Sequence, residues 1–362
     1  MKIKKIGVLT GGGDAPGLNG VIRSVVLTAI NDYDIEVVGF EDGFSGLIRN
    51  KYRVLERESV SEILHRGGTI LGTSNRDNPF HFPVRSNGQV TYQDVSDEGV
   101  SNLKKLGVDV LIVIGGDGSL RIAKEFSDKG IKIVGVPKTI DNDLGATDVT
   151  FGFNTAVTTA TEALDKLRTT VESHHGIMVL EVMGRYGGWI ALHAGLAGGA
   201  DVILIPEIPY DLEKVKEKIE KRKSQGKLSS IVVVAEGATP VNGKYTVDKM
   251  MEGRTEPIKL GGIGQVVAQQ LVELTGLEAR VTVLGYLQRG GSPTSCDRIL
   301  STRFGVMAVK QAVEGPWTTM VALHGQSVVT VSLDEAIKQL KKVDCKGELV
   351  EVARAIGVNF GK

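Results

Sequence analysis

Short apolar runs alternate with longer segments that carry apolar residues at helical spacing along most of the chain. Short apolar runs bounded by glycine or charged residues are typical of buried strands. We predict strands at Ile6–Leu9, Ile35–Phe40, Val110–Ile114, Ile131–Val136, Ile177–Val182, Val202–Ile205, Ile231–Ala235 and Val281–Leu284. We predict helices at about Leu18–Ile30, Leu120–Lys129, Phe153–Thr170 and Leu212–Lys223, and a further helix that opens at Gln288 and runs toward Val313. This alternation indicates an α/β protein with mainly parallel sheets.

Length and composition narrow the picture further. The 362 residues suffice for two lobes with a cleft between them, and the 43 basic residues balance the 43 acidic ones. A neutral chain offers no global field for nucleic acid or a membrane surface, so we expect neither as a partner. Two cysteines and the lack of a long apolar stretch lead us to expect a soluble, cytoplasmic protein.

Glycine is the one strong compositional bias. The chain has 46 glycines, where the usual share of ~7% would give about 25. They gather at the ends of predicted strands, which suits a backbone that must approach a ligand closely. Gly11–Gly17 is one such turn before a helix, and taken alone it is as consistent with a tight structural turn as with a phosphate cradle.

Two turns carry the densest chemistry, Gly115–Ser119 and Pro137–Asp143. Each follows a predicted strand, so in a right-handed crossover both emerge at the same edge of the sheet. Asp117 is placed to hold Mg²⁺, and Asp141 to take a proton from a hydroxyl. The structural alternatives are a helix N-cap for Asp117 and an Asx-turn for the second segment. We favour a metal-assisted phosphoryl-transfer site.

Two arginines have matching contexts, each between a predicted strand and a helix. Arg185 lies in Met183–Trp189, and Arg289 precedes Gly290 and Gly291. A single arginine would be read as a surface residue, but two in the same setting indicate a pair of phosphate clamps.

Taken together, these segments resemble the 6-phosphofructokinase family. The combination of Gly118 with Lys138, and residues 73–79, resemble its mixed-substrate branch in particular. The resemblance rests on residues 7–17, Gly115–Ser119, Thr139–Asp143, Glu181–Arg185 and Leu284–Pro293, which occur in the family's order. It implies transfer of a phosphoryl group to the 1-hydroxyl of fructose 6-phosphate, the committed step of glycolysis. It also implies two Rossmann-like lobes with the active site in the cleft between them.

The resemblance assigns residues to roles and to lobes. Catalysis falls to Asp141 as base, with Thr139, Asp143 and Arg185. Donor binding falls to Gly13, Arg76, Asp117, Gly118, Ser119 and Lys138, with Asp117 as the ligand of Mg²⁺. Sugar-phosphate binding falls to Thr139, Ile140, Asp141, Met183, Gly184, Arg185, Glu236, Arg280, Tyr286, Leu287, Gln288 and Arg289. The larger lobe is expected to comprise residues 1–152 and about 288–340, and the smaller lobe residues 153–287 and about 341–362.

Arg280 matches an arginine that the family supplies across a subunit boundary, which implies a homodimer or homotetramer. The donor positions disagree with each other: Gly118 leaves room for a nucleotide, while Lys138 suits pyrophosphate. We favour ATP, because an absent side chain cannot exclude a nucleotide whereas a flexible ammonium can move aside. Pyrophosphate is the first alternative, and a catalytically inactive nucleotide-binding regulator is the second.

Two further departures from the family bear on binding and control. Gly176 stands where an arginine is expected, which removes a charged contact to the neighbouring sugar-phosphate site. The basic effector pocket is incomplete, since Leu27 and Gln225 replace basic residues, and we therefore expect little or no allosteric control.

Overall fold

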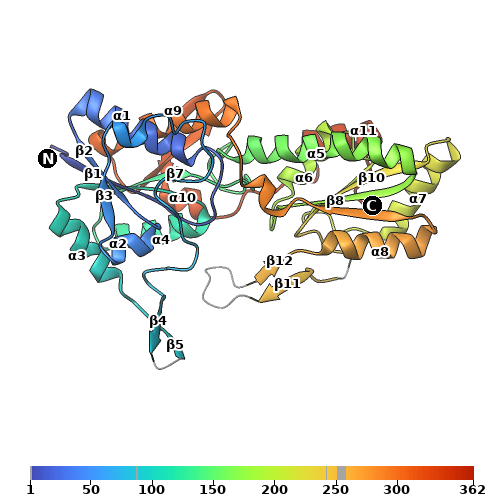
Figure 1. Cartoon of the computed structure of the whole chain (residues 1–362), viewed down its shortest axis with the longest axis horizontal. Helices are drawn as coiled ribbons and strands as arrows, with labels where there is room; N and C mark the ends of the chain where they lie inside the picture. The colour runs from blue at the N-terminus through green and yellow to red at the C-terminus, as the bar shows by residue number, and fades with distance from the viewer. Residues whose placement is uncertain (1, 87–88, 242, 251–257) are drawn as a thin grey trace.

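The computed structural model describes residues 2–86, 89–241, 243–250 and 258–362. Two helix-flanked sheets lie side by side along the long axis of the molecule (Figure 1). The α/β class and the two-lobed arrangement predicted from the sequence are confirmed.

The larger sheet has seven strands in the order β15-β14-β7-β6-β1-β2-β3. Its strands are β1 (Lys5–Thr10), β2 (Glu36–Phe40), β3 (Tyr52–Val54), β6 (Val110–Gly115), β7 (Ile133–Pro137), β14 (Thr319–His324) and β15 (Ser327–Ser332). The edge strands β3 and β15 are antiparallel to their neighbours, and the five strands between them are parallel. Strands β6 and β7 are buried at every position, as strands covered on both faces must be.

Helices cover both faces of this sheet. One face packs against α1 (Leu18–Tyr33) and α9 (Ser295–Glu314). The other packs against α2 (Phe44–Ile48), α3 (Ser96–Leu106), α4 (Asp117–Asp128) and α10 (Leu333–Ile337). A short 3₁₀ turn, η1 (Glu58–Val60), lies beside α1.

The smaller sheet has four parallel strands in the order β13-β8-β10-β9. They are β8 (Gly176–Val182), β9 (Val202–Leu204), β10 (Ser229–Ala235) and β13 (Ala279–Val283). The helices α5 (Phe153–His174), α6 (Trp189–Ala197) and α11 (Glu348–Ala355) cover one face. The helices α7 (Leu212–Ser224) and α8 (Ile263–Thr275) cover the other.

Two small hairpins project from the same side of the molecule, one from each lobe (Figure 1). They are β4 (Phe82–Ser86) with β5 (Gln89–Gln93), and β11 (Val247–Met250) with β12 (Ile258–Leu260).

A buried carboxylate joins the two lobes. Asp297, on α9 of the larger lobe, is only 1% exposed. Its Oδ2 accepts hydrogen bonds from the backbone N (2.8 Å) and Oγ1 (2.6 Å) of Thr155, at the start of α5. Near the C-terminus, Asn359 forms a β-bridge to Val202, so the end of the chain returns to the smaller sheet. The domain boundaries given above stay a prediction.

Two predicted helix starts differ from the structure. Helix α4 begins at Asp117, earlier than the predicted Leu120, because Gly116 is extended and serves as the N-cap. Helix α9 begins at Ser295 and not at Gln288, because the Thr294 side chain caps it by accepting from Asp297 N, while Gly285–Gln288 forms a separate 3₁₀ turn, η2. Among the described residues, no helix combines the length and apolarity needed to span a bilayer.

Candidate active site

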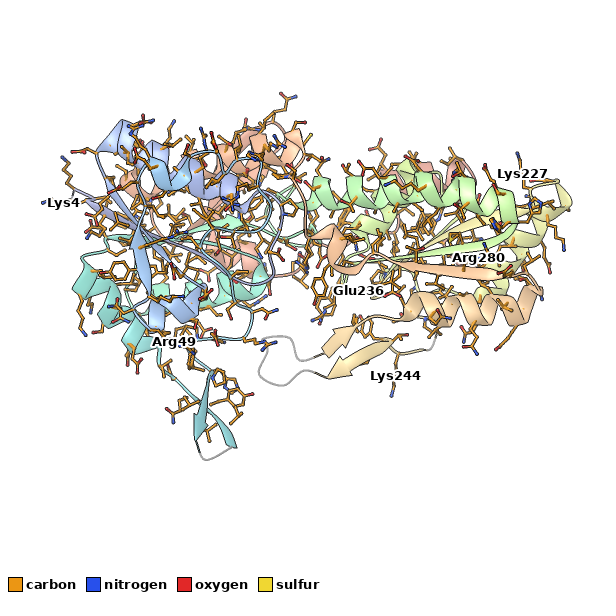
Figure 2. The ribbon with its side chains drawn as sticks, in the orientation of Figure 1. Lys4, Arg49, Lys227, Glu236, Lys244 and Arg280 are labelled. Atoms are coloured by element: carbon orange, nitrogen blue, oxygen red, sulfur yellow. The ribbon has the colours of Figure 1, made fainter. Side chains whose placement is uncertain are left out.

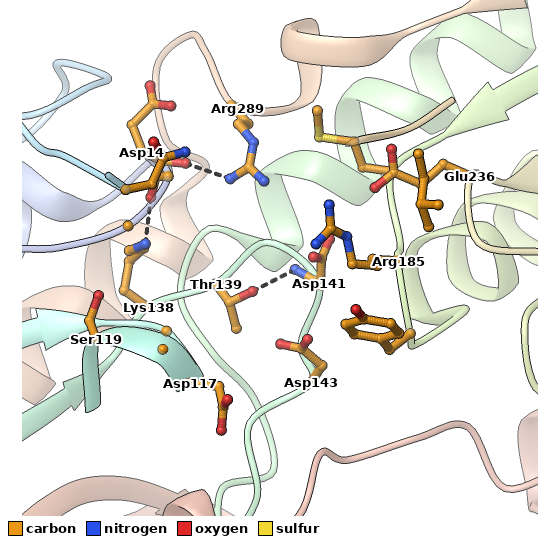
Figure 3. Close-up of a pocket in the computed structure, with 18 of the residues that line it drawn as sticks. Asp14, Asp117, Ser119, Lys138, Thr139, Asp141, Asp143, Arg185, Glu236 and Arg289 are labelled. Carbon is orange, nitrogen blue, oxygen red and sulfur yellow. Dashed lines mark hydrogen bonds between the residues drawn. The ribbon is translucent and has the colours of Figure 1, made fainter. Parts of the chain in front are cut away.

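The two acidic turns and the two arginines line one cavity of about 770 Å³. From the larger lobe come Asp117, Lys138, Thr139, Asp141 and Asp143, at the carboxyl ends of β6 and β7. The smaller lobe supplies Met183, Arg185 and Glu236 from the ends of β8 and β10, with Tyr286 and Arg289 from η2 and the residue after it. Figure 3 shows Arg185 beside Asp141 and Arg289 above Lys138, so groups from both lobes face the same space.

Close backbone packing shapes the side of the cavity that is formed by the first glycine turn and the start of α4. Gly11 N donates to Ile114 O (2.9 Å) and Gly12 N donates to Ser74 O (3.0 Å), which fixes the first glycine turn against β6 and the 73–78 loop. A Cβ on Gly115 would lie 2.4 Å from Ser119 Cβ, and one on Gly11 would lie 2.6 Å from Ser119 Oγ. Glycine is required at both positions because the first turn of α4 passes directly over them.

Lys138 lies beneath the first glycine turn. Its side chain is almost completely buried, and Nζ donates a hydrogen bond to the backbone carbonyl of Gly13. Burial lowers the pKa of Lys138 to about 7, and repulsion by Arg289 acts in the same direction, while Asp14 and nearby carboxylates oppose it. The Lys138 ammonium therefore loses its proton as the pH rises through neutrality.

Half-buried carboxylates with buried oxygen atoms form the centre of the cavity. Within the described part of the chain, the buried Oδ1 atoms of Asp117 and Asp141 have no hydrogen-bond partner. Burial raises the pKa of Asp141, against the opposing charges of Arg289, Arg185 and Lys138. Burial also raises the pKa of Asp143 to about 7, and repulsion by Asp141 adds to the shift. The geometry thus leaves carboxylate oxygens available to a proton or a cation.

The carboxylates of the cavity can be compared with the ligands that Mg²⁺ requires. No group of three or more His, Cys, Asp or Glu side chains in the described ranges could hold a metal by itself. The open Oδ1 of Asp117 lies at the start of α4, and its Oδ2 accepts from Arg121 Nε at 2.8 Å. Mg²⁺ commonly takes one or two carboxylates and completes its shell with water and substrate phosphates. The site fits Mg²⁺ brought in together with a phosphorylated donor.

Glu236 and Arg289 add a carboxylate and a guanidinium to the cavity wall. Glu236 lies in the cavity wall, and burial raises its pKa to about 7, with repulsion by Asp141 in the same direction. Arg289 Nη1 donates to Asp14 O (3.0 Å), so this arginine spans from η2 to the glycine turn. A Cβ on Gly13 would lie 2.7 Å from Arg289 Nη1, so a larger residue there would displace the guanidinium from its present position.

Six predicted site residues lie outside the cavity lining, and their roles stay predictions. Ile140 is fully buried in the core of the smaller lobe, and Gln288, also fully buried, accepts from Met183 N at 3.3 Å. Leu287 is exposed, and the backbone carbonyl of Gly184 accepts from Gly237 N at 3.2 Å. Arg76 is exposed on the 73–78 loop.

The sixth residue, Arg280, lies on the outer strand of the smaller sheet. It pairs with Glu278 (3.1 Å) and lies toward the outer end of the smaller lobe, whereas Glu236 lies at the inner end (Figure 2).

The structure also adds cavity residues that sequence reasoning missed. Glu181 is buried, and its carboxylate accepts from Gly262 N (3.0 Å) and Gly264 N (2.7 Å), which holds the start of α8 against β8. Gly261 and Gly262 therefore line the cavity, as does Leu340 from the C-terminal segment. The glycine pair before α8 was a usable signal, whereas nothing in the sequence marks Leu340.

Comparisons with known proteins agree on one family. The family described as Phosphofructokinase matches residues 5–312. The chain is 56% identical to ATP-dependent 6-phosphofructokinase 2 of Clostridium perfringens, over 99% of this chain and 98% of that protein. It is 50% identical to pyrophosphate–fructose 6-phosphate 1-phosphotransferase of Amycolatopsis methanolica, over 94% of this chain and 96% of that protein.

Solved structures show the same fold. The Pichia pastoris phosphofructokinase in the T-state superposes with a TM-score of 0.80 at 30% identity, covering 98% of this chain and 36% of the larger one. The pyrophosphate-dependent enzyme of Nitrosospira multiformis gives a TM-score of 0.81 at 23% identity, covering 98% of this chain and 92% of that one.

Proposed function

The chain belongs to the phosphofructokinase family, and on this premise we propose that it transfers the terminal phosphoryl group of ATP to the 1-hydroxyl of fructose 6-phosphate. The observation that carries the proposal is the pair of buried, unpartnered carboxylate oxygens on Asp117 and Asp141, within the described residues, in a cavity lined by Arg185 and Arg289. One oxygen suits a cation and the other suits a hydroxyl proton.

The proposed reaction is a single displacement. Asp141 takes the proton of the 1-hydroxyl as that oxygen attacks the terminal phosphorus of ATP, and the bond between this phosphorus and the bridging oxygen breaks. The products are fructose 1,6-bisphosphate and ADP, and Asp141 later returns its proton to solvent. Because burial raises the pKa of Asp141, the carboxylate is a stronger base than an exposed aspartate.

The other cavity residues stabilise charge. Arg185, which lies beside Asp141, and Thr139 are proposed to contact the transferring phosphoryl group, and their position in the cavity lining supports this role. Asp117 would hold Mg²⁺, which neutralises charge on the donor phosphates when it is bound. Arg289 and Glu236 are proposed to hold the sugar phosphate, the arginine by charge and the carboxylate by accepting from a hydroxyl.

ATP is the proposed donor because Gly118, in the first turn of α4, adds no side chain to the donor side of the cavity. The names of close relatives include both ATP-dependent and pyrophosphate-dependent enzymes. Lys138 is the observation that favours pyrophosphate, since it places an ammonium at the cavity wall. That ammonium is already bonded to Gly13 O and its side chain is almost completely buried, which limits its freedom to serve as a dedicated pyrophosphate contact.

A steady-state assay with fructose 6-phosphate and equal Mg²⁺ tests the proposal, with ATP in one arm and pyrophosphate in the other. We expect formation of the bisphosphate with ATP. Turnover with pyrophosphate alone would assign the donor to the alternative, and absence of turnover with both would contradict the proposed function.

We further propose a cytoplasmic homo-oligomer with sites shared between subunits. Both cysteines are free, which suits a reducing compartment. Arg280, exposed on the edge strand β13, is available to a neighbouring subunit.

A further inference from the structure

The C-terminal segment between α10 and α11 crosses from the larger lobe to the smaller one. It begins after Ile337 and reaches α11 at Glu348, beyond the residues that the family model matches. On the way, Lys341 passes behind the acidic turn that carries Asp141 and Asp143. The contacts of this one residue reach both lobes.

The ammonium of Lys341 is bound to the larger lobe by three hydrogen bonds. Nζ donates to Asn142 Oδ1 (3.1 Å), to Thr147 O (3.0 Å) and to Asp148 O (2.7 Å). An ammonium has three N–H donors, so its donor capacity is matched. Asn142 itself is buried between the two aspartates in a left-handed conformation, with φ at 52°. Such a conformation persists in a non-glycine residue only when its surroundings hold it.

The backbone of Lys341 joins the same turn to the smaller lobe. Its N–H donates to Asp143 O (2.8 Å), and its carbonyl accepts from Trp189 Nε1 (3.0 Å). Trp189 opens α6, directly after the loop that carries Arg185. The ammonium also lies 5.5 Å from the centroid of the Trp189 ring, within the range of a cation–π contact.

A second bridge follows two residues later. Val343 N donates to Glu207 Oε1 (2.8 Å), and the same carboxylate accepts from Gly188 N at 3.1 Å. The segment is therefore fastened to the Arg185 loop at two points, Trp189 and Gly188. Because Lys341 also holds the acidic turn, this segment connects the two halves of the cavity.

We propose that Lys341 is a positioning residue that fixes the acidic turn bearing Asp141 relative to the loop bearing Arg185. It touches neither reactant and acts through Asn142, the Asp143 backbone and Trp189. The inference rests on the proposed function, because its consequence is read in turnover. A misplacement of about 1 Å between base and phosphate clamp costs on the order of 100-fold in rate.

The test compares Lys341→Met with Lys342→Met, since Lys342 is the adjacent and exposed lysine. Lys341→Met keeps the backbone bonds and removes the ammonium. We expect kcat to fall by about 10- to 100-fold while KM for fructose 6-phosphate and for ATP changes less than about threefold. Lys342→Met should match the wild type, and Lys341→Arg should recover part of the lost kcat.

Trp189 supplies a readout that does not depend on activity. The chain has two tryptophans, so in a Trp317→Phe background the emission reports on Trp189 alone. Loss of the ammonium over its ring should shift the emission of Lys341→Met and leave that of Lys342→Met unchanged. If the wild type itself lacks turnover with either donor, the proposed function fails. The Trp189 emission would still report on the contact between the Lys341 ammonium and the Trp189 ring.

Equal kcat in Lys341→Met and Lys342→Met would overturn the proposal, as would a loss expressed only in KM. If Lys341→Met does not fold, Lys341→Arg decides instead. The planar guanidinium cannot direct three N–H groups from one atom, so we expect kcat to fall at least about threefold. An unchanged kcat in that variant would overturn the inference.

Discussion

Single residues in this cavity are tuned by burial more than by their immediate charge partners. Burial is the main cause of the raised pKa of Asp143 and Glu236, both to about 7, and of the lowered pKa of Lys138. Groups with a pKa near 7 readily gain or lose a proton when a charged ligand binds beside them. The predictions at this scale follow from those shifts.

Replacing Asp141 with asparagine should abolish proton transfer and leave the shape of the cavity intact. We expect kcat to fall by about 10²–10⁴-fold, the usual contribution of a general base, with donor affinity nearly unchanged. The wild-type kcat should also fall on the acid side, because the base must be ionised and burial raises its pKa. Asp165→Asn, which changes an exposed aspartate on α5, is the control. Near-normal turnover by Asp141→Asn would remove the residue from its role.

Donor binding should be accompanied by proton uptake at Lys138. In the free protein its pKa is about 7, so most molecules carry the neutral amine at pH 8. A donor phosphate beside Nζ favours the ammonium and raises the pKa again, which draws a proton from solution. Calorimetry of ATP binding at pH 8 in buffers of different ionisation enthalpy should show uptake in the wild type and less in Lys138→Met. Equal uptake in both proteins would place the donor away from this residue.

The sequence predicted which residues would meet in the cavity better than how each would be held. Asp117, Asp141 and Arg185 follow strands of parallel sheets, and that position alone brings them to the cavity. The burial of Lys138 could not be predicted, because it depends on the Gly13 carbonyl contributed by a distant turn. Leu340 was missed for the same reason, since its place depends on the path of the C-terminal segment.

At the level of elements, tight contacts between turns and helices set the geometry. Gly115→Ala would place a Cβ 2.4 Å from Ser119 Cβ and push the first turn of α4 away from the donor. We expect KM for ATP to rise, KM for fructose 6-phosphate to stay constant, and the free energy of unfolding to fall by about 1–3 kcal/mol. Gly290→Ala is the control, because a Cβ on Gly290 would lie no closer than 3.9 Å to its nearest neighbouring atom, Tyr286 O. Equal donor KM in both variants would argue against this packing.

The backbone conformation and surroundings of Gly176 explain why an arginine at the start of β8 would be strained. The residue has φ at 94°, and a Cβ there would lie 2.5 Å from Glu278 O on the segment leading into β13. We expect Gly176→Arg to lower the free energy of unfolding by about 1–3 kcal/mol in urea denaturation. Gly276→Arg, at φ of 63° with open space around it, should cost less. A Gly176→Arg protein as stable as the wild type would show that β13 can shift.

Many elements with a strong apolar core were predicted, although β14 and α8 were not, and most elements defined by tertiary contacts were missed. Strands such as β6 and β8 are apolar at almost every position and were located within one or two residues. The start of α9 was predicted too early, because the hydrophobic pattern does not show that the turn η2 ends before the helix begins after its cap at Thr294. Both small hairpins went unpredicted, since they contribute little to either core.

At the scale of the whole molecule, the shared-site proposal predicts that two inactive proteins can restore each other. Arg280→Ala and Asp141→Asn would damage different subunits' contributions to one site. Co-refolded in equal amounts, they should regain about a quarter of wild-type activity, because half of the pairs are mixed and each mixed pair has one intact site. Each variant refolded alone is the control. No recovery, with mixed oligomers demonstrated, would mean that Arg280 serves its own chain or none.

The two-lobed architecture followed from alternating strands and helices, but the division between the lobes did not. Strands β14 and β15 join the larger sheet late in the chain, while Asn359 returns to the smaller one. No change of composition marks these crossings, because both lobes use the same apolar strands and charged helices.

The late arrival of β14 has a consequence for synthesis on the ribosome. Strand β7 is made early, and the whole smaller sheet, from β8 to β13, is translated before β14 can pair with it. Until then the backbone of β7 is an open sheet edge, which invites pairing with other nascent chains. The core of the smaller lobe also includes residues of α11, so it is incomplete until residues 348–355 have been made. Translation arrest between β13 and β14 would therefore yield an aggregation-prone polypeptide and not a shortened enzyme.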